Sequence, residues 1–217
     1  MTPPVRHVIY LHGFASSPQS GKAERFRQEL TRRGVGWTCP DLNEPAFETL
    51  TTTRMLWQVR AAIESADGPV ALVGSSLGAF VAVHAAERDV TGKVDRLILL
   101  APALDFGGNR LTHLGPHHVD EWRTAGVLRV FHYALNEERN IEFSLYADAA
   151  KYDAMALPAP RPTLVFQGEQ DDVVSPDMVR LWTATRPEVQ LRLLQDGHQL
   201  SASLDAIWNE SATFLGV

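Results

Sequence analysis

Short apolar runs alternate with amphipathic stretches along most of the chain. The apolar runs are rich in Val, Ile and Leu and too short for helices, so they predict buried strands. They span residues 5–11, 37–40, 70–73, 94–101, 163–167 and 189–194. Between them, apolar residues at helical spacing predict helices at residues 22–33, 51–65, 177–185 and 203–215, and an Ala-rich helix that ends at Glu87. This alternation predicts an α/β fold with a six-stranded, mainly parallel sheet covered on both faces.

The alternation stops at Pro102 and resumes near residue 160. Two segments with alternating apolar and polar residues, 128–133 and 141–146, flank the polar stretch 136–140 and predict a β-hairpin whose tip lies far from the core. A structureless loop of this length is uncommon inside a compact domain. We therefore expect a single domain over residues 1–217, with residues 104–158 inserted as a small cap of helix and hairpin.

The composition is that of a soluble globular protein and disfavours several functional classes. The chain has 217 residues, a net charge of −6 and no cluster of Lys and Arg, which argues against a nucleic-acid partner. Its single cysteine, Cys39, excludes an internal disulfide and a metal site built on several thiolates. The first residues lack the apolar core of a signal peptide, and no apolar run approaches the length of a membrane helix. We expect a cytoplasmic protein without a membrane span.

The strand at residues 70–73 leads through G-S-S-L-G into the Ala-rich helix. A strand, a sharp turn and a helix around G-x-S-x-G form a nucleophile elbow, with Ser76 as the nucleophile. Gly74 and Gly78 fit because the turn leaves no room for side chains two positions from the nucleophile. The alternative is a glycine-bounded loop with an ordinary serine, but the flanking strand and helix favour catalysis. The backbone N–H of Leu77, at the start of the helix, is then a candidate donor to an oxyanion.

A serine nucleophile needs a base to take its proton and an acid to orient that base. Both partners should lie in loops after later strands, because ligands bind at the carboxyl edge of an open α/β sheet. The loop after the strand at residues 163–167 offers Asp171 and Asp172, and the loop before the last helix offers His198. The order serine, acid, histidine is that of α/β-hydrolases. The spacing alone leaves both aspartates open as the acid.

Four motifs in this order resemble the α/β-hydrolase superfamily across nearly the whole chain. They are L-H-G-F at residues 11–14, G-S-S-L-G at 74–78, G-E-Q-D-D-V-V-S-P at 168–176 and D-G-H at 196–198. The resemblance implies a three-layer sandwich and a triad of Ser76, Asp171 and His198, since the superfamily's acid usually lies three residues after the glycine that ends its strand. It also implies that the backbone N–H of Phe14 joins that of Leu77 in the oxyanion hole.

The opening L-H-G-F-A-S-S-P-Q-S-G-K-A, with G-S-S-L-G-A-F further on, resembles small bacterial YqiA-type esterases. That resemblance implies cofactor-free hydrolysis of short acyl esters through an acyl-Ser76 intermediate. The long insert departs from these esterases and leaves the substrate open. An acyl-thioesterase, similar to depalmitoylases, would use the same triad, whereas a serine peptidase or a binding module with a vestigial triad fits less well. The expected partner is a small-molecule acyl ester or thioester, with no cofactor and no metal.

The predicted cap follows a strand whose carboxyl end lies on the same edge of the sheet as Ser76. It should therefore rise over the nucleophile and form part of the acyl pocket. Its aromatic side chains suit such a wall, and they are Phe106, Trp122, Phe131, Tyr133, Phe143 and Tyr146. Of these, we expect Trp122 and Phe143 to contact the substrate. The alternative is that these aromatic side chains serve only packing or a dimer contact.

A histidine cluster in the cap, His113, His117 and His118, could suggest a metal site. However, no carboxylate or thiolate lies at a matching spacing, and the pair Gly115-Pro116 interrupts the helical turn between the first two histidines. We therefore interpret the cluster as a polar surface of the cap.

Overall fold

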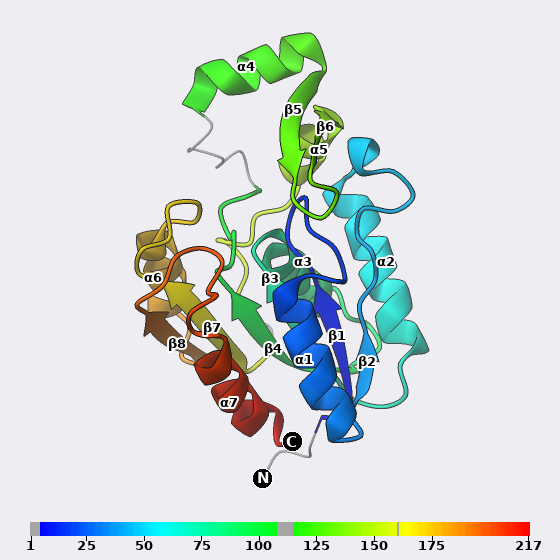
Figure 1. Ribbon diagram of the computed structural model, residues 1–217, viewed down its shortest axis with the longest axis vertical. Helices are drawn as coiled ribbons and strands as arrows, with labels where there is room; N and C mark the ends of the chain where they lie inside the picture. The colour runs from blue at the N-terminus through cyan, green and yellow to red at the C-terminus, as the bar shows by residue number, and fades with distance from the viewer. Residues whose placement is uncertain (1–4, 108–114, 160) are drawn as a thin grey trace.

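The computed structural model describes residues 5–107, 115–159 and 161–217. Within these residues, the main sheet has six parallel strands in the order β2-β1-β3-β4-β7-β8 (Figure 1). The strands are β1 (His7–Leu11), β2 (Gly36–Thr38), β3 (Val70–Ser75), β4 (Val94–Leu100), β7 (Thr163–Gly168) and β8 (Val189–Leu194). The predicted six-stranded sheet is confirmed, with small shifts at the strand ends.

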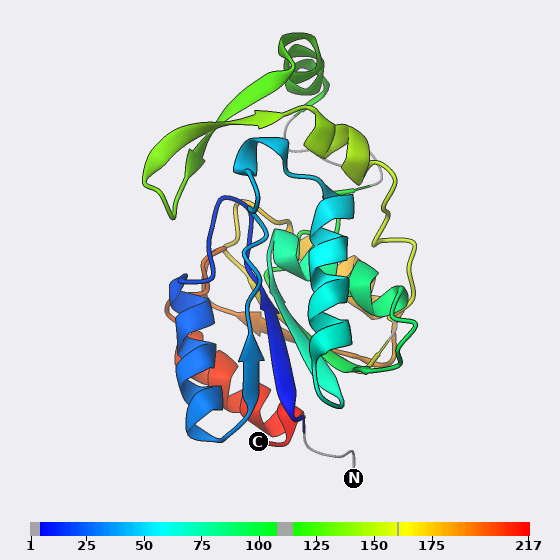
Figure 2. The same ribbon diagram turned by 90° about the vertical axis from the view of Figure 1, so that its right-hand side faces the viewer.

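Helices cover both faces of this sheet, so the molecule has three layers. Helices α1 (Gly21–Arg32) and α7 (Leu204–Leu215) lie on one face (Figure 2). Helices α2 (Thr52–Ser65), α3 (Leu77–Glu87) and α6 (Pro176–Ala184) lie on the other. None of the helices in the described ranges is both long and apolar enough to cross a membrane.

The two apolar cores follow from the alternation of side chains along each strand. In β1, Tyr10 is buried together with Phe26 of α1 and Trp208 of α7. Its neighbour Ile9 points to the opposite face and is buried with Met55 of α2. A strand buried on both faces reads as a continuous apolar run, and each fully buried large side chain contributes roughly 1.5–3 kcal/mol. The carboxyl ends of the strands are thereby held as one rigid edge.

Residues of the predicted cap form α4 (Gly115–Ala125), β5 (Val127–His132), β6 (Glu137–Glu142) and α5 (Ser144–Ala149). Strands β5 and β6 pair as an antiparallel hairpin. The cap lies beyond the carboxyl ends of the strands, at the top of Figure 1. Figure 2 shows the hairpin reaching over the side of the sheet on which α1 lies.

The prediction of the second hairpin strand at residues 141–146 is wrong. Strand β6 ends at Glu142, and the residues that follow Phe143 form α5. The charged residues before Ile141 belong to the strand because one face of this two-stranded ribbon is exposed. In β6 only Ile141 is buried, and Arg139 forms an ion pair with Glu48 of the core domain. The apolar alternation that would mark a strand is therefore missing.

The hairpin turn packs against the core domain, so the prediction that its tip lies far from the core is also wrong. The Ala134 N–H donates to the Ala15 carbonyl at 3.4 Å. Beside the turn, the His132 ring centroid lies 4.7 Å from that of Phe47, which begins the short helix η1 (Phe47–Thr49). These contacts hold the ribbon against the loop that follows β1 and against η1.

Candidate active site

Ser76 stands between β3 and α3 with backbone angles φ 53° and ψ −115°. A positive φ is unfavourable for a residue with a side chain and persists only where the surroundings enforce it. Two backbone hydrogen bonds do so here. The Ser76 N–H donates to the Leu100 carbonyl at 2.9 Å, and the Ser76 carbonyl accepts from the Ala103 N–H at 3.2 Å. A turn of this shape exposes the serine hydroxyl at the carboxyl edge of the sheet.

Gly74 and Gly78 are required by close backbone approaches at this turn. A Cβ atom on Gly78 would lie 2.1 Å from the carbonyl oxygen of Leu11, and one on Gly74 would lie 2.5 Å from the Cα of Ala79. Both distances are far below van der Waals contact, so a side chain at either position would force the elbow apart. As predicted from G-S-S-L-G, the turn leaves no room for side chains at these two positions.

His198 lies between Ser76 and Asp171. Its Nε2 is 3.1 Å from Ser76 Oγ, and its Nδ1 is 2.9 and 3.1 Å from the two carboxylate oxygens of Asp171. An ionised carboxylate only accepts hydrogen bonds, so Nδ1 carries the proton and Nε2 is free to accept from the Ser76 hydroxyl. These are the contacts that a base-activated nucleophile needs.

The Asp171 side chain is fully buried, and its other hydrogen bonds come from its own loop and β7. Gln167 Nε2 donates at 2.9 Å, and the N–H groups of Val173 and Val174 donate at 2.9 and 2.8 Å. Burial alone raises the pKa of Asp171, but the hydrogen bonds from His198 and from these backbone groups outweigh it, and the pKa lies below its usual value. Asp171 is therefore an anion at neutral pH.

Asp172, the neighbouring aspartate, is exposed at the surface. It does not cap the helix that follows, because Ser175 has that position and its hydroxyl accepts from the Met178 N–H at 3.4 Å. Of the two aspartates that the sequence leaves open, the structure brings only Asp171 to His198.

The two expected oxyanion donors belong to segments that border Ser76. Leu77 is the first residue of α3, so its N–H has no acceptor within the helix, and the positive end of the helix dipole favours negative charge there. Phe14 lies in the loop after β1, where a Cβ atom on Gly13 would be 3.4 Å from Ser76 Cβ. Among the described residues, the Phe14 N–H has no hydrogen-bond acceptor. Both N–H groups are thus available to a ligand bound at Ser76.

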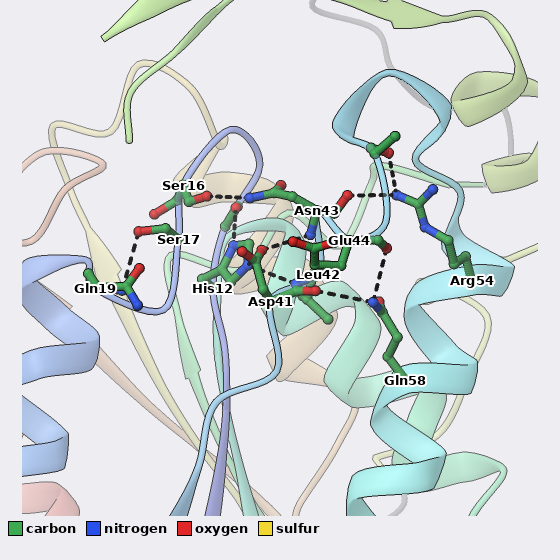
Figure 3. Close-up of polar contacts among 12 residues, drawn as sticks. His12, Ser16, Ser17, Gln19, Asp41, Leu42, Asn43, Glu44, Arg54 and Gln58 are labelled. Atoms are coloured by element: carbon green, nitrogen blue, oxygen red, sulfur yellow. Dashed lines mark hydrogen bonds and ion pairs between the residues drawn. The ribbon is translucent and has the colours of Figure 1, made fainter. Parts of the chain in front are cut away.

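Buried His12 fixes the orientation of this loop (Figure 3). Its Nε2 accepts from the Leu42 N–H at 3.0 Å, so this nitrogen is unprotonated and the nearby Asp41 carboxylate, at 3.3 Å, is not its ion-pair partner. The proton is on Nδ1, which donates to the Gly13 carbonyl at 2.9 Å. In a trans peptide the C=O and N–H point in opposite directions, so fixing the Gly13 carbonyl also fixes the Phe14 N–H.

The loop after β2 also stabilises the loop after β1. Asn43 Nδ2 donates to the Ser16 carbonyl at 2.8 Å, and the Asn43 carbonyl accepts from Arg54 of α2 at 3.2 Å (Figure 3). Gln58, also on α2, donates to the Asp41 carbonyl at 3.1 Å. The loop after β1 is therefore tied to α2 through side chains that do not touch the hollow around Ser76.

A hollow of about 750 Å³ opens beside Ser76 and His198. Besides the elbow, four segments that are distant in sequence form its walls: the loop after β1 with the start of α1, the hairpin turn, the loop after β7, and the residues after His198. Phe14, Val173 and Leu204 contribute apolar surface, whereas the start of α1 and the loop before it contribute mostly polar side chains.

Trp122 and Phe143 lie within the cap and do not line this hollow. Trp122 is 4% exposed, its Nε1 donates to the Ile141 carbonyl at 3.1 Å, and its ring centroid is 5.6 Å from that of Phe143. The cap residues that reach the hollow are instead Tyr133 and Ala134 of the hairpin turn. The packing of the cap occupies both predicted rings, so the structure does not bring them to Ser76, and their contact with a substrate stays a prediction.

Of the histidine cluster, His113 and the side chain of His117 lie outside the described residues, and His118 is exposed. Across the ranges that the structure describes, no three His, Cys, Asp or Glu side chains are grouped closely enough to hold a metal ion. The interpretation of the cluster as a polar surface stays a prediction.

A family model described as an uncharacterised protein family, UPF0227, matches residues 7–207. The chain belongs to this family. The match runs from β1 into α7 and therefore includes the elbow and the loops that carry Asp171 and His198. Among curated proteins, none matches the chain significantly.

Solved structures with the same fold are more distant in sequence. A putative hydrolase from Agrobacterium vitis S4 is 24% identical, with a TM-score of 0.82 over 96% of this chain and 87% of that one. Mouse alpha/beta hydrolase domain-containing protein 10 is 22% identical, with a TM-score of 0.78 over 99% and 91%. Est1E from Butyrivibrio proteoclasticus, with ferulic acid bound, is 18% identical, with a TM-score of 0.77 over 98% and 88%. This UPF0227 member has the α/β-hydrolase fold, as predicted.

Two residues at the site of this UPF0227 member, His12 and Lys22, were given no role of their own by the sequence. His12 directly follows the first buried strand and precedes the expected oxyanion loop, and that position is a usable signal. Lys22 looks like an ordinary polar residue at the start of an amphipathic helix. Tyr133 is one of the aromatic residues that the sequence offers for the pocket wall, and it reaches the hollow where Trp122 and Phe143 do not.

Proposed function

We propose that this protein is a serine hydrolase that cleaves carboxylic esters through an acyl-Ser76 intermediate. The observation that carries the proposal is the continuous chain of contacts from Ser76 Oγ through His198 to buried, ionised Asp171, at an elbow held in a strained conformation. A serine without a catalytic role gains nothing from a positive φ, and strain of this kind gathers at active sites. Its proposed class is that of a carboxylesterase.

In acylation, His198 Nε2 takes the hydroxyl proton as Ser76 Oγ attacks the ester carbonyl carbon. The carbonyl oxygen becomes an anion and accepts hydrogen bonds from the N–H groups of Leu77 and Phe14. The tetrahedral intermediate collapses, the bond to the alcohol oxygen breaks, and His198 gives its proton to that oxygen. In deacylation, water takes the place of Ser76 as the nucleophile, and the acid and the free serine are released.

The His12 network supports the oxyanion role of Phe14 and gives a testable prediction. In a His12→Leu variant, nothing replaces the donor to the Gly13 carbonyl, so the Phe14 N–H is free to turn away. We expect kcat to fall by up to about 10²-fold, the loss typical of one oxyanion donor, with little change in KM. Steady-state kinetics measure this. In His12→Asn the side-chain amide can donate to the same carbonyl, so a larger loss in that variant than in His12→Leu would contradict the assignment.

The nearest alternative is an acyl-thioesterase, because the same residues would attack a thioester and release a thiol. Ester hydrolysis is favoured by the solved structures with this fold that are described as lipolytic enzymes and as a monoacylglycerol lipase. The test is a panel of p-nitrophenyl esters and acyl-CoA thioesters of matched chain length, run side by side. We expect higher kcat/KM for the esters. Faster thioester cleavage would favour the alternative, and failure to cleave either class would contradict both.

The acyl-chain preference tests which cap residues face the substrate. Since Tyr133 lines the hollow and Trp122 packs inside the cap, we expect Tyr133→Ala to change KM and chain-length preference more than Trp122→Ala or Phe143→Ala. Truncating these rings should mainly destabilise the cap, by about 3–5 kcal/mol for buried Trp122 and by less for half-buried Phe143. A larger change of preference in folded Trp122→Ala or Phe143→Ala would restore the sequence prediction that these rings form the acyl wall.

A further inference from the structure

One wall of the hollow beside Ser76 is polar, although the expected acyl pocket is mostly apolar. This polar wall is the stretch from Ser16 to Lys22, together with Gln199 and Ser201, which follow His198 in sequence. Its polar side chains are those of Ser16, Ser17, Gln19, Ser20, Lys22, Gln199 and Ser201. A purely hydrocarbon ester would remove these groups from water without giving them hydrogen-bond partners, which is unfavourable. The polar wall therefore suits a substrate with a polar group near its ester bond.

Lys22 gives this wall a positive charge close to the catalytic histidine. Its Nζ donates to the carbonyl of Gln199, the residue after His198, at 2.8 Å. An ammonium group has three N–H donors, so two remain for a ligand. Among the described residues, no carboxylate lines the hollow and none forms an ion pair with Nζ.

The carboxylates nearest to Lys22 are engaged elsewhere. The Asp171 carboxylate accepts hydrogen bonds from His198 and from the backbone of its own loop. Asp196 accepts from the N–H groups of Gly197 and Ser203 at 2.8 and 3.0 Å. Neither residue lines the hollow, so a negatively charged group that enters it meets the ammonium group first.

We propose that Lys22 and the hydroxyl groups beside it bind a singly charged anionic group, such as a carboxylate, carried by the ester substrate. The inference rests on the proposed ester hydrolysis and names the class of ester. A charge-assisted hydrogen bond from an ammonium group is about twice as strong as a neutral one, and the hydroxyls complete the shell of donors around the anion. One lysine balances one negative charge, which favours a carboxylate over a phosphate dianion.

The pKa of Lys22 gives this binding a pH dependence. Burial lowers the pKa of Lys22 to about 8, although the negative charges of Asp171 and Asp196 oppose the shift. The cation is present below that pH and is lost above it. Preference for an anionic ester should therefore be full near neutral pH and should fall as the pH rises through 8. The ratio of rates for an anionic and a neutral ester isolates this effect, because a change with pH that acts on both esters alike cancels in the ratio.

The test compares matched pairs of esters with wild type, Lys22→Gln and Lys22→Arg. In the first pair, the p-nitrophenyl monoester of adipic acid carries the charge on the acyl group, and its methyl ester is the neutral partner. In the second, 4-carboxyphenyl butyrate carries the charge on the leaving group, and its methyl ester is again neutral. If Lys22→Gln affects the anionic ester of the first pair, the polar wall lies beside the acyl group. If it affects that of the second pair, the wall lies beside the leaving group. Arg60→Gln, on the exposed face of α2, is the control for net charge.

We expect Lys22→Gln to raise KM for one anionic ester about tenfold and to leave its neutral partner within about twofold. Lys22→Arg and Arg60→Gln should keep the wild-type preference, and raising the pH past 8 should abolish it in wild type. Equal losses for the anionic and neutral esters would overturn the inference, because Lys22 would then only brace the His198 loop through Gln199. An unchanged preference in Lys22→Gln would overturn it too. If wild type cleaves none of the four esters, the proposed ester hydrolysis fails as well.

Discussion

Replacing Ser76 with alanine is expected to lower kcat for ester hydrolysis by about 10⁴-fold or more. The serine oxygen forms the acyl bond, and no other hydroxyl is hydrogen-bonded to His198 among the described residues. The loss should appear in kcat and kcat/KM alike, because the substrate still fits the hollow while the covalent step is gone. Steady-state kinetics on a p-nitrophenyl ester measure it, and the thermal unfolding midpoint checks that the variant is folded.

Ser75→Ala is the matched control for that experiment. Ser75 is the neighbouring serine at the end of β3, but its hydroxyl makes no hydrogen bond to His198. We expect its loss of kcat to be far smaller than that of Ser76→Ala. If folded Ser76→Ala keeps most of the activity, the proposed mechanism is wrong, whatever Ser75→Ala does.

The second large effect is expected at Asp171. In Asp171→Asn the side chain keeps its shape but loses its charge, and its amide N–H can donate to His198 Nδ1. His198 is then stabilised with its proton on Nε2, where it can no longer accept from Ser76. A loss of about 10⁴-fold in kcat is typical of such a change. If hydroxide takes over the role of His198 as the base, the loss of kcat in Asp171→Asn should become smaller at alkaline pH. A pH–rate profile of the variant is therefore measured together with its steady-state kinetics.

Asp172→Asn is the control, since it makes the same chemical change one residue further along. Asp172 is exposed and neither contacts His198 nor caps α6, so we expect activity within about twofold of wild type and a change in stability of at most about 0.5 kcal/mol. A larger catalytic loss at Asp172 than at Asp171 would reverse the assignment of the acid.

The parts of the site that sequence predicts well are those where backbone sterics demand particular residues. At the elbow, Gly74 and Gly78 lie so close to other backbone atoms that no side chain fits. The two glycines in the sequence therefore indicate the sharp turn. The strands are predictable for a related reason. Burial on both faces leaves a continuous apolar run, as in β3, where every residue is buried.

The cap is predicted less well because its residues are only partly buried. Strand β6 has a single buried residue, Ile141, so its sequence lacks the alternation of apolar and polar residues that predicts a strand. The position of the hairpin turn depends on contacts with distant segments, such as the Ala134 N–H to the Ala15 carbonyl. The same holds for Lys22, which meets Gln199 across 177 positions of sequence. Spacing along the chain carries no information about such contacts.

Labelling with a fluorophosphonate probe tests the central claim most directly, because the probe reacts covalently with a serine activated by a histidine and requires no knowledge of the substrate. We expect one equivalent to attach to wild type, with tandem mass spectrometry of the digested protein placing the phosphonyl group on Ser76. Labelling should be absent in Ser76→Ala and strongly slowed in His198→Ala, while Ser75→Ala reacts like wild type. A folded wild-type protein that stays unlabelled, or a label on any residue other than Ser76, would contradict the account and favour a binding module with a vestigial triad.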